Sequence, residues 1–199
     1  MYQKTDKVIT YLSKQYAKLF RQVTSFDELN VIDVSHKIFD EAVILTEREV
    51  ARLVKMVYDS KREGGEISSE DALSLVFTLM LAYNPVTKYI YRNEIDRKRS
   101  RFAEGVIASE TPRKEVALAE RLLIAMNKQF AEDATFAAVV QAYKDDGVEK
   151  VRWITAEDDR RCQECKARHG KVYPINNIPP KPHRYCRCYI EKEKEIADS

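Results

Sequence analysis

All four cysteines of the chain lie in one short segment near its carboxyl end, together with two of its three histidines. Cys162 and Cys165 are separated by two residues, and so are His183 and Cys186 further along, with Cys188 two positions later. Two such pairs about 15–20 residues apart have the spacing of a structural zinc site. A gap of two residues lets a tight turn direct both side chains at one ion. Two turns then complete a tetrahedron of sulfur and imidazole ligands around Zn²⁺.

Five candidate ligands compete for the four positions of such a site. Cys162 and Cys165 form the first predicted pair, and we prefer His183 with Cys186 as the second. A pair formed by Cys186 and Cys188 is the alternative, because residues two apart on a strand face the same way. If Cys188 is not a ligand, it is expected to be a small buried hydrophobic residue or a sulfur close to the metal.

Disulfides and redox chemistry explain this cluster less well than a metal does. The amino-terminal residues 1–10 have no apolar stretch of the kind that a secretory signal needs, so we expect a reducing cytoplasm. In that compartment cysteine clusters are more often metal or catalytic sites than disulfides. A thioredoxin-like site would need a CxxC at a helix start within a βαβ pattern, which the sequence does not indicate.

A bound metal would also explain how the segment 158–188 can be stably folded. This segment carries few large apolar side chains, and a unit of this size cannot bury enough apolar surface to fold by itself. A structural zinc ion contributes on the order of 10 kcal/mol or more to such small units. Without metal or docking onto other parts of the chain, we expect the segment to be disordered.

The first three-quarters of the chain is predicted to be helical. Apolar residues recur there at three- and four-residue spacing, while Gly and Pro are scarce. Thr46 with Glu49 three residues later is a capping-box pattern, which indicates a helix start at Thr46. The expected helices cover residues 8–23, 27–45, 46–65, 68–85, 86–109, 112–130 and 133–147.

The pattern changes after Gly147. Residues 148–155 alternate and are rich in β-branched and aromatic side chains, which predicts a strand, and residues 171–175 and 185–190 are candidates for two more. The predicted fold class is α+β. A mainly helical domain covers residues 1–148, and a small zinc-stabilised module with short strands and a charged tail covers residues 149–199.

Charge does not by itself indicate a nucleic-acid partner. The formal net charge is +2, and no apolar run approaches the ~20 residues of a membrane span. Bases and tyrosines gather around the cysteines, so contact with DNA phosphates through Arg168, Lys171 and Arg184 is one hypothesis. We favour the alternative, a solvated surface in which arginines pair with Asp158, Asp159 and the acidic tail.

A second basic run lies on the expected helix 86–109, largely opposite its apolar residues. We expect a solvated face there, although a partner could use the patch. The same default applies to His36, which we expect to be an ordinary packed or exposed helix residue. The bases of the patch are Arg97, Lys98, Arg99 and Arg101.

An enzyme is not predicted. A metal-dependent nuclease would need a free histidine and open metal positions. Once four ligands hold zinc, only His169, Asp158 and Asp159 remain nearby, and these three residues do not make a catalytic site. The chain has no Gly-rich phosphate loop, no GxSxG and no HExxH.

Residues 147–188 resemble the carboxyl-terminal signature of the phage minor head proteins, the head-morphogenesis family typified by protein F of phage Mu. The matching features are Trp153 in a strand, Asp158 and Arg160 before the first cysteine, Gly170 after the CxxC, and the Pro-x-His-x-x-Cys-Arg-Cys ending. A weaker likeness covers residues 89–109 and the helices that lead to Gly147.

The resemblance implies a minor structural protein of a tailed-phage head, located in the virion or the host cytoplasm. Such proteins act in head morphogenesis, DNA packaging or ejection, and their partners are the portal and the major capsid protein. Some relatives carry toxin or transferase domains, for which 199 residues leave no room, so a structural role is expected. A zinc-stabilised nucleic-acid-binding protein is the alternative, and a metal-dependent nuclease using His169 is the least favoured hypothesis.

Overall fold

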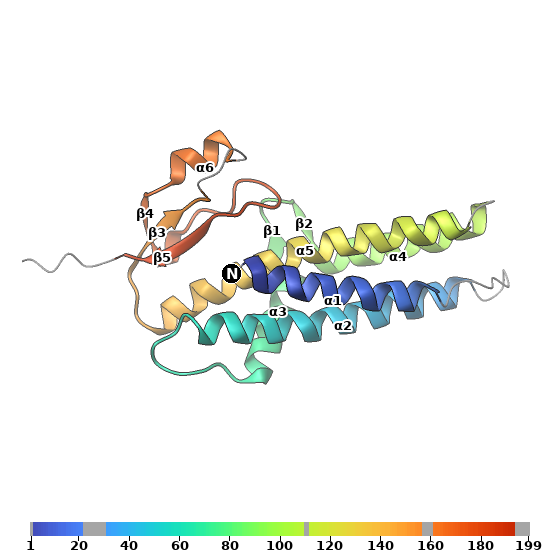
Figure 1. The fold of residues 1–199 in the computed structure, drawn as a ribbon, viewed down its shortest axis with the longest axis horizontal. Coiled ribbons are helices and arrows are strands. Elements are labelled where there is room, and N and C mark those ends of the chain that lie inside the picture. The colour runs from blue at the N-terminus through green and yellow to red at the C-terminus, as the bar shows by residue number, and fades with distance from the viewer. Residues whose placement is uncertain (1, 22–30, 110–111, 157–160, 194–199) are drawn as a thin grey trace, which may run out of the picture.

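The computed structural model describes residues 2–21, 31–109, 112–156 and 161–193. Long helices lie side by side along the longest axis of the molecule, and a small sheet with a short helix sits at one end of them (Figure 1). We call residues 2–145 the helical body and residues 150–193 the C-terminal module. The mainly helical architecture with a small sheet agrees with the predicted α+β class. No helix within the described residues is long and apolar enough to cross a membrane.

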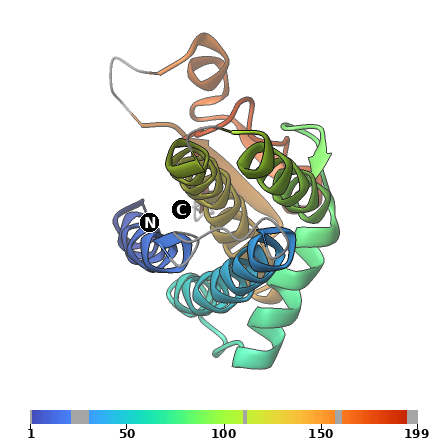
Figure 2. The same ribbon diagram turned by 90° about the vertical axis from the view of Figure 1, so that its right-hand side faces the viewer.

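The described residues of the helical body form five helices and one small hairpin. Seen end-on, the helices surround a common interior (Figure 2). The aromatic rings of Phe20, Phe39 and Phe102 meet in that interior, with centroids 5.5 to 5.7 Å apart. In chain order the elements are α1 (Tyr2–Arg21), α2 (Val31–Asp59), α3 (Ser69–Leu81), β1 (Tyr83–Asn84), β2 (Tyr89–Ile90), α4 (Tyr91–Ala108) and α5 (Pro112–Asp145).

The predicted helix start at Thr46 is wrong, because α2 runs through it without a break. The Thr46 hydroxyl donates to the carbonyl of Ala42 at 2.7 Å, a bond that a threonine inside a helix can make. Its oxygen also shares a hydrogen bond with the Tyr16 hydroxyl and accepts one from Asn127 Nδ2 at 3.1 Å. Thr46 therefore serves a buried polar network between α1, α2 and α5 instead of capping a helix.

The expected break between residues 130 and 133 is also wrong, since α5 is one helix of 34 residues. Ala131, Ala134 and Ala138 are fully buried and continue the same apolar face across the expected gap. The Asp133 carboxylate accepts hydrogen bonds from Gln129 Nε2 and from Asn84 Nδ2, at 2.9 and 2.7 Å. It does not cap a new helix.

The helix expected over 86–109 begins later, at Tyr91, because residues 83–90 form the antiparallel hairpin β1–β2. The Asn84 side chain accepts hydrogen bonds from the backbone N–H groups of Val86 and Thr87, at 2.9 and 3.1 Å. This is the Asx-turn geometry that asparagine favours. Lys88 completes the turn with φ of 56°.

In its described residues, the C-terminal module is a three-stranded antiparallel sheet with one short α-helix and one 3₁₀ helix. The strand order is β4-β3-β5, so the central strand is the one predicted over residues 148–155. β5 starts after Cys188, so neither Cys186 nor Cys188 lies on a strand. The elements are β3 (Lys150–Ile154), α6 (Gln163–Arg168), β4 (Val172–Pro174), the 3₁₀ helix η2 (Ile175–Asn177) and β5 (Tyr189–Lys192).

Gly147 ends α5 with φ of +72°, and the N–H of Val148 reaches back to the carbonyl of Tyr143 at 2.9 Å. This is a glycine helix stop of the Schellman kind. Beyond it, Val151, Trp153 and Ile190 are buried and join the same apolar cluster as the helices. The division into separate domains at residue 148 stays a prediction.

Candidate metal centre

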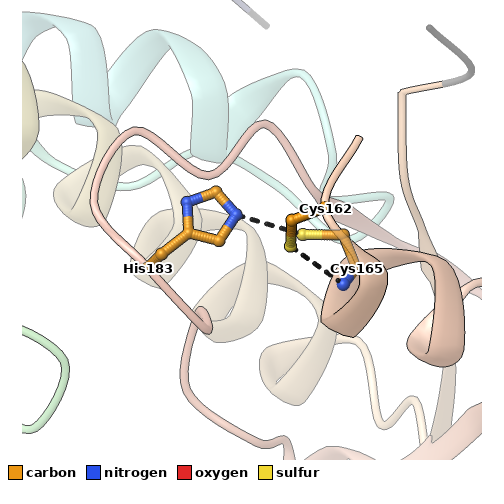
Figure 3. Close-up of side chains that lie close together, drawn as sticks. All are labelled: Cys162, Cys165 and His183. Carbon is orange, nitrogen blue, oxygen red and sulfur yellow. Dashed lines mark hydrogen bonds between the residues drawn. The ribbon is translucent and has the colours of Figure 1, made fainter. Parts of the chain in front are cut away.

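The first pair of predicted ligands lies at the start of α6. Cys162 is the N-cap residue, and its sulfur accepts a hydrogen bond from the backbone N–H of Cys165 at 3.3 Å. This turn brings both sulfurs to the same side of the chain (Figure 3). Sequence reasoning placed no helix here, and α6 leads into an antiparallel sheet. The βαβ setting of a thioredoxin-like site is therefore not what surrounds this CxxC.

His183 faces these cysteines from the loop before β5 (Figure 3). Its Nε2 lies 3.3 Å from the sulfur of Cys165. Its Nδ1 lies 2.8 Å from the carbonyl oxygen of Arg184. Because a carbonyl can only accept, Nδ1 is the protonated nitrogen of the neutral ring, and in that form Nε2 would present its lone pair to the cysteines. A backbone partner of this kind commonly orients metal-binding histidines.

The remaining two cysteines approach Cys165 from its buried side. Cys186 Sγ is 3.7 Å from Cys165 Sγ. Ligand atoms of Cys162, Cys165 and His183 lie within 4.8 Å of one another, and so do those of Cys165, Cys186 and Cys188. The other four candidate ligands therefore gather around Cys165, and none of the four cysteines forms a disulfide.

The distances suit a tetrahedral metal ion. Zinc–sulfur bonds of about 2.3 Å and zinc–nitrogen bonds of about 2.0–2.1 Å place neighbouring ligand atoms about 3.5–3.8 Å apart. The separations of Cys165 from His183 and Cys186, at 3.3 and 3.7 Å, are close to these values. The donor set, thiols with one imidazole, is the one that soft metal ions prefer. The residues present thus fit a metal ion.

The pKa values of the four thiols differ because burial, hydrogen bonds between sulfurs and a backbone donor act on them unequally. Burial raises the pKa of Cys165 to about 12, and a hydrogen bond with Cys188 together with burial raises that of Cys186. The same contact with Cys186 lowers the pKa of Cys188 to about 5, and the backbone N–H of Cys165 lowers that of Cys162. Adjacent thiolates repel one another, so all of them can ionise together only beside a cation.

His169 is not part of this group. It is exposed at the end of α6, and its Nδ1 accepts a hydrogen bond from the backbone N–H of Thr155 at 3.2 Å. Asp158, Asp159 and Arg160 lie outside the described residues. Within the described part of the chain, His169 belongs to neither group of candidate ligands.

The three bases considered for DNA contact differ in their surroundings. Arg168 donates to Glu164 at 2.6 Å and to the carbonyl of Pro180 at 2.5 Å, and its guanidinium lies 5.4 Å from the Trp153 ring centroid. Through these contacts Arg168 stabilises the C-terminal module. Lys171 and Arg184 are exposed, although Arg184 also lies over a tyrosine ring of the hairpin.

The basic patch on α4 is largely neutralised. Arg97 and Lys98 pair with Glu94, at 2.5 and 3.5 Å, while Arg99 pairs with Asp40 at 2.8 Å and with Asp96 at 3.1 Å. These ion pairs offset three of the four bases of the patch, and its use by a partner stays a prediction. In the C-terminal module, Arg152 likewise pairs with Glu193 of the acidic tail.

We call the loop before β5, residues 178–188, the ligand loop. Its docking onto the helical body was not predicted. The backbone N–H of Tyr185 donates to Gln129 Oε1 on α5 at 2.8 Å, and Tyr185 itself has φ of 56°. Lys181, in the same loop, is only 6% exposed. The bond between Tyr185 and Gln129 joins residues 56 positions apart, and no local pattern in the sequence points to contacts of this kind. They hold the second half of the metal site against α5.

The model of one protein family matches residues 86–191, which extend from the β1–β2 hairpin through all five candidate ligands. That family is described as "Phage Mu protein F like protein". The chain belongs to this family. The match confirms the resemblance found in the sequence. No curated protein and no solved structure matches the chain.

Membership of the Mu protein F-like family indicates a phage head-related protein. The match begins beyond α1, α2 and α3, so the helices that complete the body lie outside it. It includes α4, α5 and the whole sheet up to Glu191. The five candidate ligands therefore lie in the part of the chain that the family model matches.

Proposed function

We propose that this chain is a non-enzymatic minor protein of a tailed-phage head, acting in head morphogenesis, DNA packaging or ejection. A structural zinc ion holds its C-terminal module in the shape that docks on the portal or the major capsid protein. The observation that carries the proposal is the gathering of five soft ligands around Cys165, inside the region that matches the Mu protein F-like family.

The proposed ligands are Cys162, Cys165, His183 and Cys186. The contacts of Cys165 with His183 and with Cys186 support this set. Cys188 then remains beside the centre as a sulfur in contact with Cys186. Bound zinc would cross-link the start of α6 to the loop before β5 and carry no reaction.

The metal assignment can be tested by elemental analysis of the purified chain, with one zinc ion expected per molecule. Cys186→Ser should lose most of the bound zinc, whereas Cys188→Ser should keep it. The reverse outcome would exchange the fourth ligand for Cys188. A wild-type chain that is folded throughout and free of metal would contradict the zinc proposal.

The head assignment can be tested by mass spectrometry of purified head particles from a producing host. The chain is expected in particles at a fixed ratio to the portal protein. Particles with full infectivity that lack the chain would refute the proposed role.

Contact with DNA through Lys171 and Arg184 is a secondary proposal, supported by their exposure in the module. Replacing both residues with Glu should weaken DNA binding. It should also reduce the slope of log binding constant against log salt concentration by about 1–2. Lys14→Glu on the exposed face of α1 is the matched control. Equal binding by all variants would remove this proposal.

A further inference from the structure

The exposed face of α3 is apolar over most of its length. Leu73, Phe77 and Leu81 follow one another at four-residue spacing and are 45%, 55% and 49% exposed. We call these three residues the α3 stripe. The helix carries only two charged residues, Glu70 and Asp71, and both are acids in its first turn. A row of large apolar side chains at the surface is typical of a contact with another protein.

A groove runs beside the beginning of the stripe, between α2 and α3. Its volume is about 420 Å³. Ile44 and Ala51 of α2, together with Leu73 of α3, supply its apolar lining, and Ile44 is 64% exposed. Arg48 and Arg52 line the same groove from α2. The α2–α3 groove therefore combines apolar walls with two guanidinium groups along one side.

The two arginines of the α2–α3 groove share one carboxylate. Both contact the same oxygen of Glu49, Arg48 at 3.3 Å and Arg52 at 2.7 Å. Their side chains nevertheless remain 57% and 67% exposed. Glu47, another acid of the lining, interacts electrostatically with Arg92 instead. Among the described residues, the arginine pair is thus left with one positive charge that no carboxylate offsets.

The two acids of α3 are the opposite case. Glu70 and Asp71 are exposed, and neither forms an ion pair within the described part of the chain. The Asp71 carboxylate accepts a hydrogen bond from the Ser68 hydroxyl at 2.7 Å, which leaves its charge in place. Glu70 precedes Leu73 by three residues and so lies on the same side of the helix as the stripe. One face of the molecule therefore carries both surplus acids and surplus bases next to apolar surface.

The side chains beside the stripe leave space for a second helix. Ser74 and Thr78 directly follow Leu73 and Phe77, and both are small and exposed. A row of large side chains next to a row of small ones is the arrangement in which the ridges of one helix fit the grooves of another. Because both rows belong to α3, two copies of this helix can match each other.

We propose that the α3 stripe and the α2–α3 groove bind the same face of a second copy of the chain, forming a two-fold symmetric dimer. Glu70 and Asp71 of each copy approach Arg48 and Arg52 of the other. A two-fold contact uses one patch twice, so the patch must carry both halves of every complementary pair, as this face does. An acidic helix of a different protein would satisfy the arginines but leave Glu70 and Asp71 without a cation.

The proposed dimer contact lies away from the metal centre. The beginning of α3 is on the side of the helical body opposite the C-terminal module (Figure 1, Figure 2). It also lies outside residues 86–191, which the family model matches. The dimer therefore goes beyond the proposed function and depends on neither the metal nor the head assignment, and it would leave the ligand residues of both copies outside the contact.

Sedimentation velocity of the full chain at about 1 to 100 µM tests the dimer. The wild type should pass from monomer to dimer within this range, because a face one short helix long is at the small end of specific interfaces, which cover about 1,200–2,000 Å² in total. A chain that stays monomeric throughout this range would overturn the inference.

Leu73→Asp tests the apolar part of the contact. It should weaken dimer formation about tenfold or more, because the contact would then bury a carboxylate without a partner. Leu118→Asp is the matched control on α5, where Leu118 is 48% exposed and lies outside both the stripe and the groove. It should associate like the wild type. Equal association of the two variants would place the contact elsewhere and overturn the inference.

Two charge reversals test the symmetry. Arg52→Glu and Glu70→Lys should each weaken self-association about tenfold, since like charges then face one another in both halves of the contact. An equal mixture of the two variants should form mixed dimers, because each reversed charge then faces an opposite charge. Sedimentation with one variant fluorescently labelled measures this, and a misfolded variant could not regain association on mixing. A mixture that associates no better than either variant alone would exclude the two-fold contact.

Discussion

The helical body and the C-terminal module reach a folded state by different means. The body buries a continuous apolar interior in which rings such as Phe20 and Phe39 pack edge to face. Each of its long helices contributes buried side chains to this one interior. The module has strands of three to five residues and a few large buried side chains, chiefly Trp153 and Ile190. Its other fully buried positions include three cysteines.

This contrast shows where each region is vulnerable. In the body, many apolar contacts share the stabilisation of the fold, so a single substitution should weaken the fold without abolishing it. In the module, a small number of ligands and one indole ring connect most of the elements. Each of the following changes tests whether the two regions differ as proposed.

Metal removal should separate the two regions most strongly. After chelation, hydrogen exchange in residues 161–190 should approach the rate of an unfolded chain, since a structural zinc ion contributes on the order of 10 kcal/mol to units of this size. Protection in α2 and α5 should be retained. Hydrogen exchange followed by mass spectrometry reports both regions in one experiment. Equal loss of protection in both would mean that they fold as one unit.

Trp153→Ala should have the next largest effect, because this side chain is fully buried between the sheet and α5. Replacing a buried aromatic residue by alanine costs about 3–5 kcal/mol. Val172→Ala on the neighbouring strand β4 is the control, since Val172 is 40% exposed and should lose less than about 1 kcal/mol. Denaturant unfolding of the metal-bound chain measures both. Similar losses would place the core of the module elsewhere.

Tyr16→Phe should destabilise the body by a smaller amount. The substitution keeps the ring but removes the hydroxyl that bonds Thr46 and Asn127, leaving buried polar groups short of a partner. Such losses cost about 1–3 kcal/mol. Tyr11→Phe removes an exposed hydroxyl from the same helix and should change the free energy of unfolding by less than about 0.5 kcal/mol. Urea unfolding followed by circular dichroism would decide between these outcomes.

Asp146 connects the two regions in a pH-dependent way. The backbone N–H of Glu63 foremost, together with Lys192 of β5, lowers the pKa of Asp146 below its ordinary value of 3.8. A lowered folded-state pKa contributes stability that is fully present above the unfolded pKa and is lost as the pH falls through the folded one. Wild type should therefore exceed Asp146→Asn in melting temperature at neutral pH, and the difference should shrink as the pH falls below 3.8 and vanish once the carboxyl group is protonated in the folded chain.

Glu149→Gln, at an exposed position three residues later, is the control for this comparison. Its melting temperature should follow that of the wild type across the same pH range. A difference between wild type and Asp146→Asn that persists in strong acid would show that the aspartate acts through packing and not through its charge.

Local patterns predicted the parts of this molecule that local chemistry determines. Apolar spacing located the helices, alternation located β3, and ligand spacing identified the five residues around Cys165. Thr46 misled because a capping box and a threonine that bonds the preceding turn have the same sequence. Only the distant Tyr16 and Asn127 distinguish them. The docking of Tyr185 on Gln129 is likewise a contact between remote residues, which spacing cannot reveal.

The polar network of Tyr16, Thr46 and Asn127 fixes how the helices of the body are aligned along their axes. Sliding any of these helices by one turn, about 5.4 Å, would leave the three side chains buried and unbonded. The helices are therefore locked against longitudinal displacement, as a buried polar residue locks the alignment of a coiled coil. A force on one end of α5, a helix about 50 Å long, would therefore move the whole helix together with the loop that docks on Gln129.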